Sequence, residues 1–138
     1  MEHKVQANWQ GEMQFMADAP GGIVHLDAAE EFGGKNKGNR SKSLMLVALA
    51  GCTGMDVVSL IRKMRLNVDG FTVEVTAQLS EEHPKMYTQT HVSYSFSGTE
   101  LDQEKLEKAV DLSFDTYCGV IAMFKTFSTV TKEIRYNS

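Results

Sequence analysis

The sequence predicts an α+β domain, and three observations support that prediction. Segments that alternate apolar and polar residues lie near both ends of the chain, a long apolar helix lies between them, and a second, amphipathic helix follows a long hairpin. These elements do not alternate as they do in βαβ folds. A chain of 138 residues has the usual size of one domain and buries roughly two-thirds of its surface, so we expect residues 1–138 to form a single domain with antiparallel sheets.

The segment Ser41–Arg65 is the helix around which we expect the rest of the chain to pack. Leu44–Ala50 is apolar at every position, which predicts a helix buried on all sides. Cys52 lies between Gly51 and Gly54, and each glycine costs a helix interior about 0.8–1 kcal/mol relative to alanine. We therefore expect a close approach here, by a substrate or by a second backbone. A helix break at Gly51 would also place the Cys52 sulfur near a helix N-terminus.

The first forty residues predict a small antiparallel meander followed by a loop. Val5–Trp9 and Met13–Ala17 alternate apolar with polar residues on either side of a short connection, as a hairpin does. Ile23–Leu26 follows the turn residues Pro-Gly-Gly and predicts a third strand. Ala28–Lys42 has the glycine-rich, basic composition of a flexible, solvated loop.

The second half of the chain predicts a hairpin, two helices and a last strand. Phe71–Leu79 has the clearest period-two pattern, and Tyr87–Phe96 is rich in β-branched and aromatic residues, so the two are expected to pair. Asp102 is a candidate cap for an amphipathic helix that begins at Gln103. The remaining expected elements are a short helix over Val120–Phe124 and a strand over Phe127–Tyr136.

Composition excludes several classes of protein. The chain has 14 basic and 18 acidic residues, a net charge of -4 and no basic stripe, so nucleic acid is not an expected partner. The N-terminus lacks a signal-peptide pattern, and the apolar runs are shorter than the ~18–20 residues that span a bilayer, so we expect a cytoplasmic protein without a membrane partner. The four histidines have no metal-ligand spacing, and we predict no metal or cofactor. They are His3, His25, His83 and His91.

Cys52 and Cys118 are the only cysteines. A cytoplasmic location argues against a static disulfide and leaves two alternatives, buried free thiols or a transient redox pair. Asp56 lies one helical turn beyond Cys52, where a carboxylate disfavours a second negative charge on the sulfur. The same carboxylate is also a candidate helix cap or ion-pair partner of Arg40 or Arg62.

Two long segments carry a family resemblance. The run LMLVALAGCTGMDVVSLIRKMR, the hairpin after it, and LEKAVDLSFDTYCGVIAMF resemble the OsmC/Ohr family of osmotically inducible and organic-hydroperoxide-resistance proteins, and most closely its OsmC-like subgroup. The resemblance covers most of the chain from Ser41 onward. It implies the OsmC-like fold, an intertwined homodimer with the long central helices at its middle and the active sites at the subunit interface.

The resemblance also implies a thiol peroxidase that acts in oxidative-stress defence. Cys52 would attack an organic hydroperoxide and become a sulfenic acid, Cys118 would resolve it as a disulfide, and a dithiol reductant would restore both thiols. No cofactor is implied.

The residues that activate the thiolate in the peroxidase branches are not present in this sequence. Those branches carry Pro-Glu before the cysteine helix, where this chain has Ser41-Lys42-Ser43, and no arginine precedes Arg40. Arg40, Lys42 and Asp56 are the candidate activating or substrate-contacting residues. Arg40 and Lys42 lie twelve and ten positions before Cys52, which is roughly 15–18 Å along an unbroken helix. The alternative function is a non-catalytic homodimeric binding or redox-sensing module of the same fold.

Overall fold

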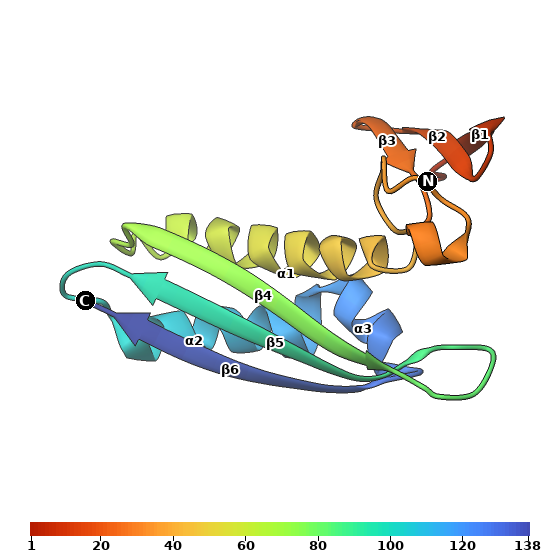
Figure 1. Cartoon of the computed structure of the whole chain (residues 1–138). Helices are drawn as coiled ribbons and strands as arrows, with labels where there is room; N and C mark the ends of the chain where they lie inside the picture. The colour runs from red at the N-terminus through yellow and green to blue at the C-terminus, as the bar shows by residue number, and fades with distance from the viewer. The chain divides into compact units, whose positions relative to one another are not determined.

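The computed structural model describes residues 1–138 as two compact units, Met1–Met45 and Leu46–Ser138. The N-terminal unit contains a three-stranded antiparallel sheet with the order β1-β2-β3 (Figure 1). Its strands are β1 (Gln6–Gly11), β2 (Gln14–Ala19) and β3 (Gly22–Leu26). The predicted meander is therefore confirmed.

Asp27 organises the loop that follows β3. Its carboxylate accepts hydrogen bonds from the backbone N–H groups of Ala28, Lys35 and Lys37, at 2.7, 3.2 and 3.0 Å. These bonds, that of Lys37 first, hold the pKa of Asp27 below its usual value. Gly34 is required because a Cβ there would lie 2.0 Å from the Ala28 carbonyl oxygen. The loop also holds a 3₁₀ turn, η1 (Glu30–Phe32), so it is more ordered than its composition predicts.

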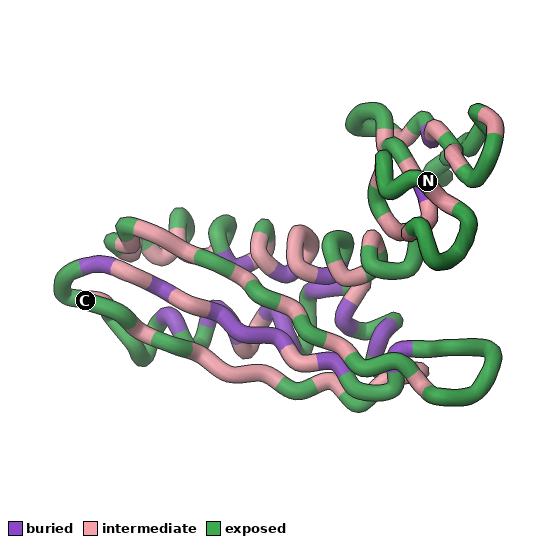
Figure 2. The backbone as a smooth tube through the Cα atoms, viewed as in Figure 1, coloured by how far each residue is buried: buried purple, intermediate pink, exposed green.

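The C-terminal unit is built on a second three-stranded sheet with the order β4-β5-β6. Its strands are β4 (Gly70–Leu79), β5 (Tyr87–Ser97) and β6 (Thr129–Asn137). β4 and β5 pair antiparallel as predicted, and Phe71 stacks on its cross-strand partner Phe96 with ring centroids 4.7 Å apart. Buried positions concentrate along β5, the middle strand (Figure 2).

The pairing of β6 differs from the antiparallel sheet that the sequence predicts, because β6 runs parallel to β5. The chain between them forms α2 (Gln103–Leu112), a π-helical segment η2 (Ser113–Tyr117) and α3 (Gly119–Lys125). A parallel pair needs a crossover connection of this kind, and these helices return the chain to the end of the sheet where β5 began. The chain therefore contains one strand–helix–strand crossover unit. The sequence did not predict it, because strands and helices do not alternate regularly along the rest of the chain.

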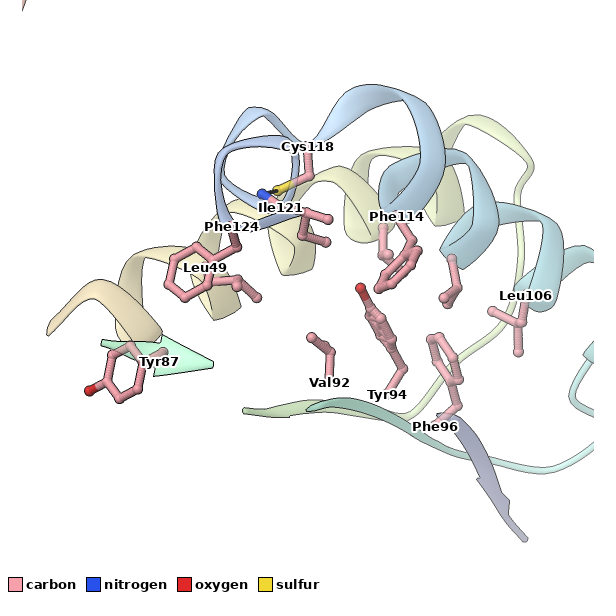
Figure 3. Close-up of a cluster of buried hydrophobic side chains, with 12 residues drawn as sticks. Leu49, Tyr87, Val92, Tyr94, Phe96, Leu106, Phe114, Cys118, Ile121 and Phe124 are labelled. Atoms are coloured by element: carbon pink, nitrogen blue, oxygen red, sulfur yellow. Dashed lines mark hydrogen bonds between the residues drawn. The ribbon is translucent and has the colours of Figure 1, made fainter. Parts of the chain in front are cut away.

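Three helices cover one face of this sheet. The core joins Leu49 of α1 (Leu44–Lys63), Tyr94 and Phe96 of β5, and Leu106 of α2 (Figure 3). Val57 of α1 belongs to the same cluster. The predicted cap is also present, since the Asp102 side chain accepts a hydrogen bond from the Lys105 N–H at 3.2 Å.

The long helix α1 differs from its prediction in two ways. It is continuous from Leu44 to Lys63, so Gly51 does not break it and Cys52 lies in its middle. It is also buried along one face only, at Leu49, Thr53 and Val57, because a single layer of sheet and helices contacts one side.

α1 is also long and apolar enough to cross a bilayer, by length and composition alone. The sequence prediction missed this because it counted uninterrupted apolar residues. In the structure Leu49 and Val57 of this helix pack in the core, and 17% of its most apolar window is buried within the chain. The core helix of a globular domain meets the same criterion.

Candidate functional site

Cys52 and Asp56 lie four residues apart on α1, so their side chains project from the same face of the helix. Both are half-buried, between the exposed side of the helix and the residues that enter the core. The continuous helix gives them a fixed spacing along the axis. Asp56 does not cap a helix segment, which was one of its expected roles.

Cys118 comes from a different element, at the junction between η2 and α3. Its side chain is 3% exposed, and its sulfur accepts a hydrogen bond from the Ile121 backbone N–H at 3.4 Å (Figure 3). Burial, followed by the neighbouring Cys52 sulfur, raises the pKa of Cys118 to about 11. Cys118 is therefore a protonated thiol near neutral pH.

The structure brings these three residues together. The Cys52 Sγ, the Cys118 Sγ and a carboxylate oxygen of Asp56 all lie within 4.8 Å of one another. Both cysteines are free thiols. Two sulfurs that are distant in the sequence thus share one site with a carboxylate.

A chain of buried hydroxyl groups supports the Asp56 carboxylate. The Ser113 Oγ donates to Asp56 Oδ2 at 2.9 Å, and lies 2.7 Å from the Thr53 Oγ1, which in turn lies 2.7 Å from the Tyr94 hydroxyl. Because Ser113 donates to the carboxylate, Thr53 donates to Ser113, and Tyr94 donates to Thr53. Burial raises the pKa of Tyr94 to about 12, so it remains a donor at physiological pH.

Arg40 and Lys42 belong to the N-terminal unit, not to the unit that carries the cysteines. Arg40 donates hydrogen bonds to the Gly38 carbonyl and to the Asn36 side chain. Arg62, which the sequence made a candidate ion-pair partner of Asp56 within the same unit, forms no ion pair with it.

The family assignment agrees with this arrangement. The family described as OsmC-like protein matches residues 34–133, which include both cysteines and Asp56. The chain belongs to the OsmC-like family. The resemblance found in the sequence is therefore confirmed.

Individual relatives extend the OsmC-like match over nearly the whole chain. Protein YhfA of Escherichia coli K12 is 32% identical over 132 residues, which cover 93% of each protein. A crystal structure of a hypothetical protein from Aquifex aeolicus has a TM-score of 0.83 at 26% identity, covering 100% of this chain and 99% of that one. The organic hydroperoxide resistance protein OhrB of Bacillus subtilis shares the fold, with a TM-score of 0.66 at 17% identity over 98% of each chain.

Sequence reasoning missed the hydroxyl chain behind this OsmC-like site. Ser113 lies four residues after Ala109 on the buried face that continues from α2, and a polar residue at such a position signals a buried hydrogen bond. Thr53 is adjacent to Cys52 and Tyr94 belongs to the predicted strand Tyr87–Phe96, and neither position carries such a signal in the sequence. Their connection needs the packed arrangement of α1, β5 and η2.

Proposed function

We propose that this protein is a cysteine-based hydroperoxide reductase of the OsmC-like family, with Cys52 as the attacking residue and Cys118 as the resolving residue. The observation that supports the proposal is the approach of the two sulfurs to within 4.8 Å from separate elements. The family's solved structures include organic hydroperoxide resistance proteins, which points to an organic peroxide as the substrate.

The different burial of the two cysteines supports these roles. Cys52 is half-buried, so part of its side chain reaches solvent, whereas Cys118 is buried and accepts an N–H hydrogen bond. A peroxidatic cysteine must meet the substrate, and a resolving cysteine must meet only the oxidised sulfur.

The reaction then has three steps. The Cys52 sulfur forms a bond to one peroxide oxygen, the O–O bond breaks, and the alcohol leaves with a proton, which converts Cys52 to a sulfenic acid. The Cys118 sulfur attacks Cys52, an S–S bond forms, and the hydroxyl group leaves with the Cys118 proton as water. A dithiol reductant restores both thiols by exchange.

Asp56 is the candidate proton acceptor for these three reaction steps. Its carboxylate lies within 4.8 Å of both sulfurs, and Ser113 fixes one of its oxygens. In the proposed mechanism it relays the Cys118 proton to the departing hydroxyl group. Arg40 and Lys42 have no assigned step.

We also propose that two subunits pair through α1, in the cytoplasm. An apolar groove runs beside this helix, and its lining includes the exposed side chains Val47, Met55 and Val58. Such a face on a helix with only one buried side favours burial by a second copy of the chain.

The alternative is a homodimeric binding or redox-sensing module without turnover. It is favoured by the absence of any ion pair between Asp56 and a basic side chain of the C-terminal unit, since a nearby cation is a common means of stabilising a thiolate.

Thiol counting distinguishes the two functions. Reduced wild type, Cys52→Ser and Cys118→Ser are titrated with an organic hydroperoxide and with hydrogen peroxide. An enzyme loses both thiols rapidly, Cys118→Ser accumulates a sulfenic acid that a dimedone reagent traps, and excess dithiol sustains peroxide consumption. A Cys52 that reacts no faster than a small free thiol rules out the peroxidase. Oxidation without sustained turnover supports the sensor.

A further inference from the structure

We propose that the reduced protein binds Zn²⁺ through Cys52, Cys118 and Asp56. The three side chains offer two sulfur ligands and one oxygen ligand, all within 4.8 Å of one another. In a tetrahedral zinc site, bonds of about 2.3 Å to sulfur and 2.0–2.2 Å to oxygen place the ligand atoms roughly 3.6–3.8 Å apart. No pair therefore has to close by more than about 1 Å.

The ligands come from two elements that are already packed together. Cys52 and Asp56 project from one face of α1 at positions i and i+4, a spacing that places two ligands on one metal. Cys118 approaches from the turn between η2 and α3. The sequence predicted no metal site because its four histidines have no metal-ligand spacing, and only the packed structure brings Cys118 to Cys52 and Asp56.

Two ligands are also held in orientation by outer hydrogen bonds. Ser113 Oγ donates to Asp56 Oδ2 at 2.9 Å, which holds the carboxylate in one orientation. Thr53 supports Ser113 at 2.7 Å in turn. The Ile121 N–H donates to the Cys118 sulfur at 3.4 Å. Metal sites rely on such partners to fix the ligands.

The chemistry of the donors selects the metal. Two sulfurs with one carboxylate suit Zn²⁺, whereas Mg²⁺ and Ca²⁺ require six or more oxygen ligands. Within the C-terminal unit no basic side chain pairs with Asp56, so no ion pair of that unit compensates the negative charge of this cluster. Three protein ligands leave a fourth position for water, and Cys52 and Asp56 are only half-buried, so the cluster is not sealed from solvent.

Zinc binding and peroxide reduction would then compete for the same sulfurs, a consequence that rests on the proposed peroxidase function. Zinc-bound Cys52 is shielded from the hydroperoxide. Oxidation of both thiolates by one hydroperoxide, with uptake of two protons, gives the Cys52–Cys118 disulfide, an alcohol and water. The disulfide has lost two metal ligands, so Zn²⁺ leaves.

Zinc affinity is measured on the reduced full-length protein by competition with a chromogenic chelator, and stoichiometry by native mass spectrometry. We expect one Zn²⁺ per subunit. Cys52→Ser, Cys118→Ser and Asp56→Asn should each lose at least about tenfold in affinity, and Ser113→Ala roughly tenfold through its outer hydrogen bond. Asp115→Asn removes an exposed carboxylate of η2, the segment that also holds Ser113, and is the matched control, with unchanged affinity.

Co²⁺ gives a second measurement that does not depend on variants. Cobalt bound at this site should show thiolate-to-metal charge-transfer absorption, and one equivalent of peroxide should abolish it. Thermal unfolding of each variant without metal establishes that it is folded.

The results separate the two proposals. Peroxide consumption without stoichiometric zinc binding overturns the metal site and leaves the peroxidase standing. Zinc binding that survives both cysteine substitutions also overturns it. Stoichiometric zinc binding in a protein that does not react with peroxide supports the metal site and removes the peroxidase.

Discussion

Ser113 Oγ donates a hydrogen bond to Asp56 Oδ2 at 2.9 Å, and so connects the π-helical segment after α2 to the helix that carries Cys52. The bond holds the carboxylate at the two sulfurs whether Asp56 serves as a proton acceptor or as a metal ligand. It is the last step of a chain that begins at the Tyr94 hydroxyl on β5. The site is therefore fixed from the core of the sheet.

Thr53 is the central member of that chain, and Thr53→Val is expected to destabilise the protein by about 1–3 kcal/mol. Valine has nearly the same shape, but it leaves the buried Tyr94 hydroxyl without its acceptor and the Ser113 hydroxyl without its donor. The measurement is the free energy of unfolding in denaturant. Thr72→Val, at an exposed position of β4, is the matched control. Equal stabilities of the two variants would show that the hydroxyl chain contributes little.

Much of the fold was predictable because local patterns agree with the packed structure. Phe71–Leu79 alternates strictly, and its odd positions pack against the core as far as Ala77, whereas Leu79 at the end of the strand is exposed. Asp102 caps its helix as its residue type predicts. The parallel pairing of β6 was not predictable in this way, because period-two alternation does not encode the direction of the partner strand.

The candidate site was predictable only in part. The roles of the two cysteines were inferred from the resemblance to a family, and the structure places the two sulfurs close together. The positions of Ser113 and Thr53 behind Asp56 depend on how two helices pack, which no spacing within one segment specifies. Arg40 was a candidate because it is the nearest preceding arginine, yet its hydrogen bonds lie within the loop around Asp27.

The proposed dimer predicts that a charge on the exposed face of α1 separates the subunits. Val47 is 63% exposed and lines the apolar groove beside the helix, so Val47→Lys should shift the protein from dimer to monomer in size-exclusion chromatography with light scattering. A symmetric interface buries the new charge twice. Gln78→Lys, on the exposed polar face of β4, should leave the mass unchanged. A wild type that is monomeric at all concentrations would contradict the proposed dimer.

Gly51 gives an independent test of the same face. An added Cβ meets no atom within 4 Å in the subunit, so Gly51→Ala in an isolated chain should gain about 0.8–1 kcal/mol from helix propensity. If a second helix packs against Gly51 in the dimer, the added methyl group destabilises that contact. We therefore expect Gly51→Ala to weaken the dimer. A stabilised protein with an unchanged dimer dissociation constant would show that Gly51 has no role in packing.

The hydrogen bonds to the Glu133 carboxylate predict that the protein loses stability in acid. The carboxylate accepts hydrogen bonds from His91, Ser93 and Arg135, and these, that of His91 first, lower its pKa from 4.5 to about 2. The unfolded chain therefore binds more protons between these values, and this contribution to stability is complete above about pH 4.5 and is lost as the pH falls toward 2.

Glu133→Gln should remove that dependence. The difference in unfolding free energy between wild type and Glu133→Gln, measured by denaturant titration at a series of pH values, is expected to be largest near pH 6 and to shrink as the pH falls below 4.5. Glu74→Gln removes a carboxylate on the same sheet that forms no side-chain hydrogen bond or ion pair, and controls for the loss of one charge. A lowered pKa of Glu133 requires the unfolding free energies of wild type and Glu133→Gln to converge in acid. If their difference stays constant from pH 6 to pH 2.5, the hydrogen bonds from His91 and Ser93 do not favour the ionised carboxylate.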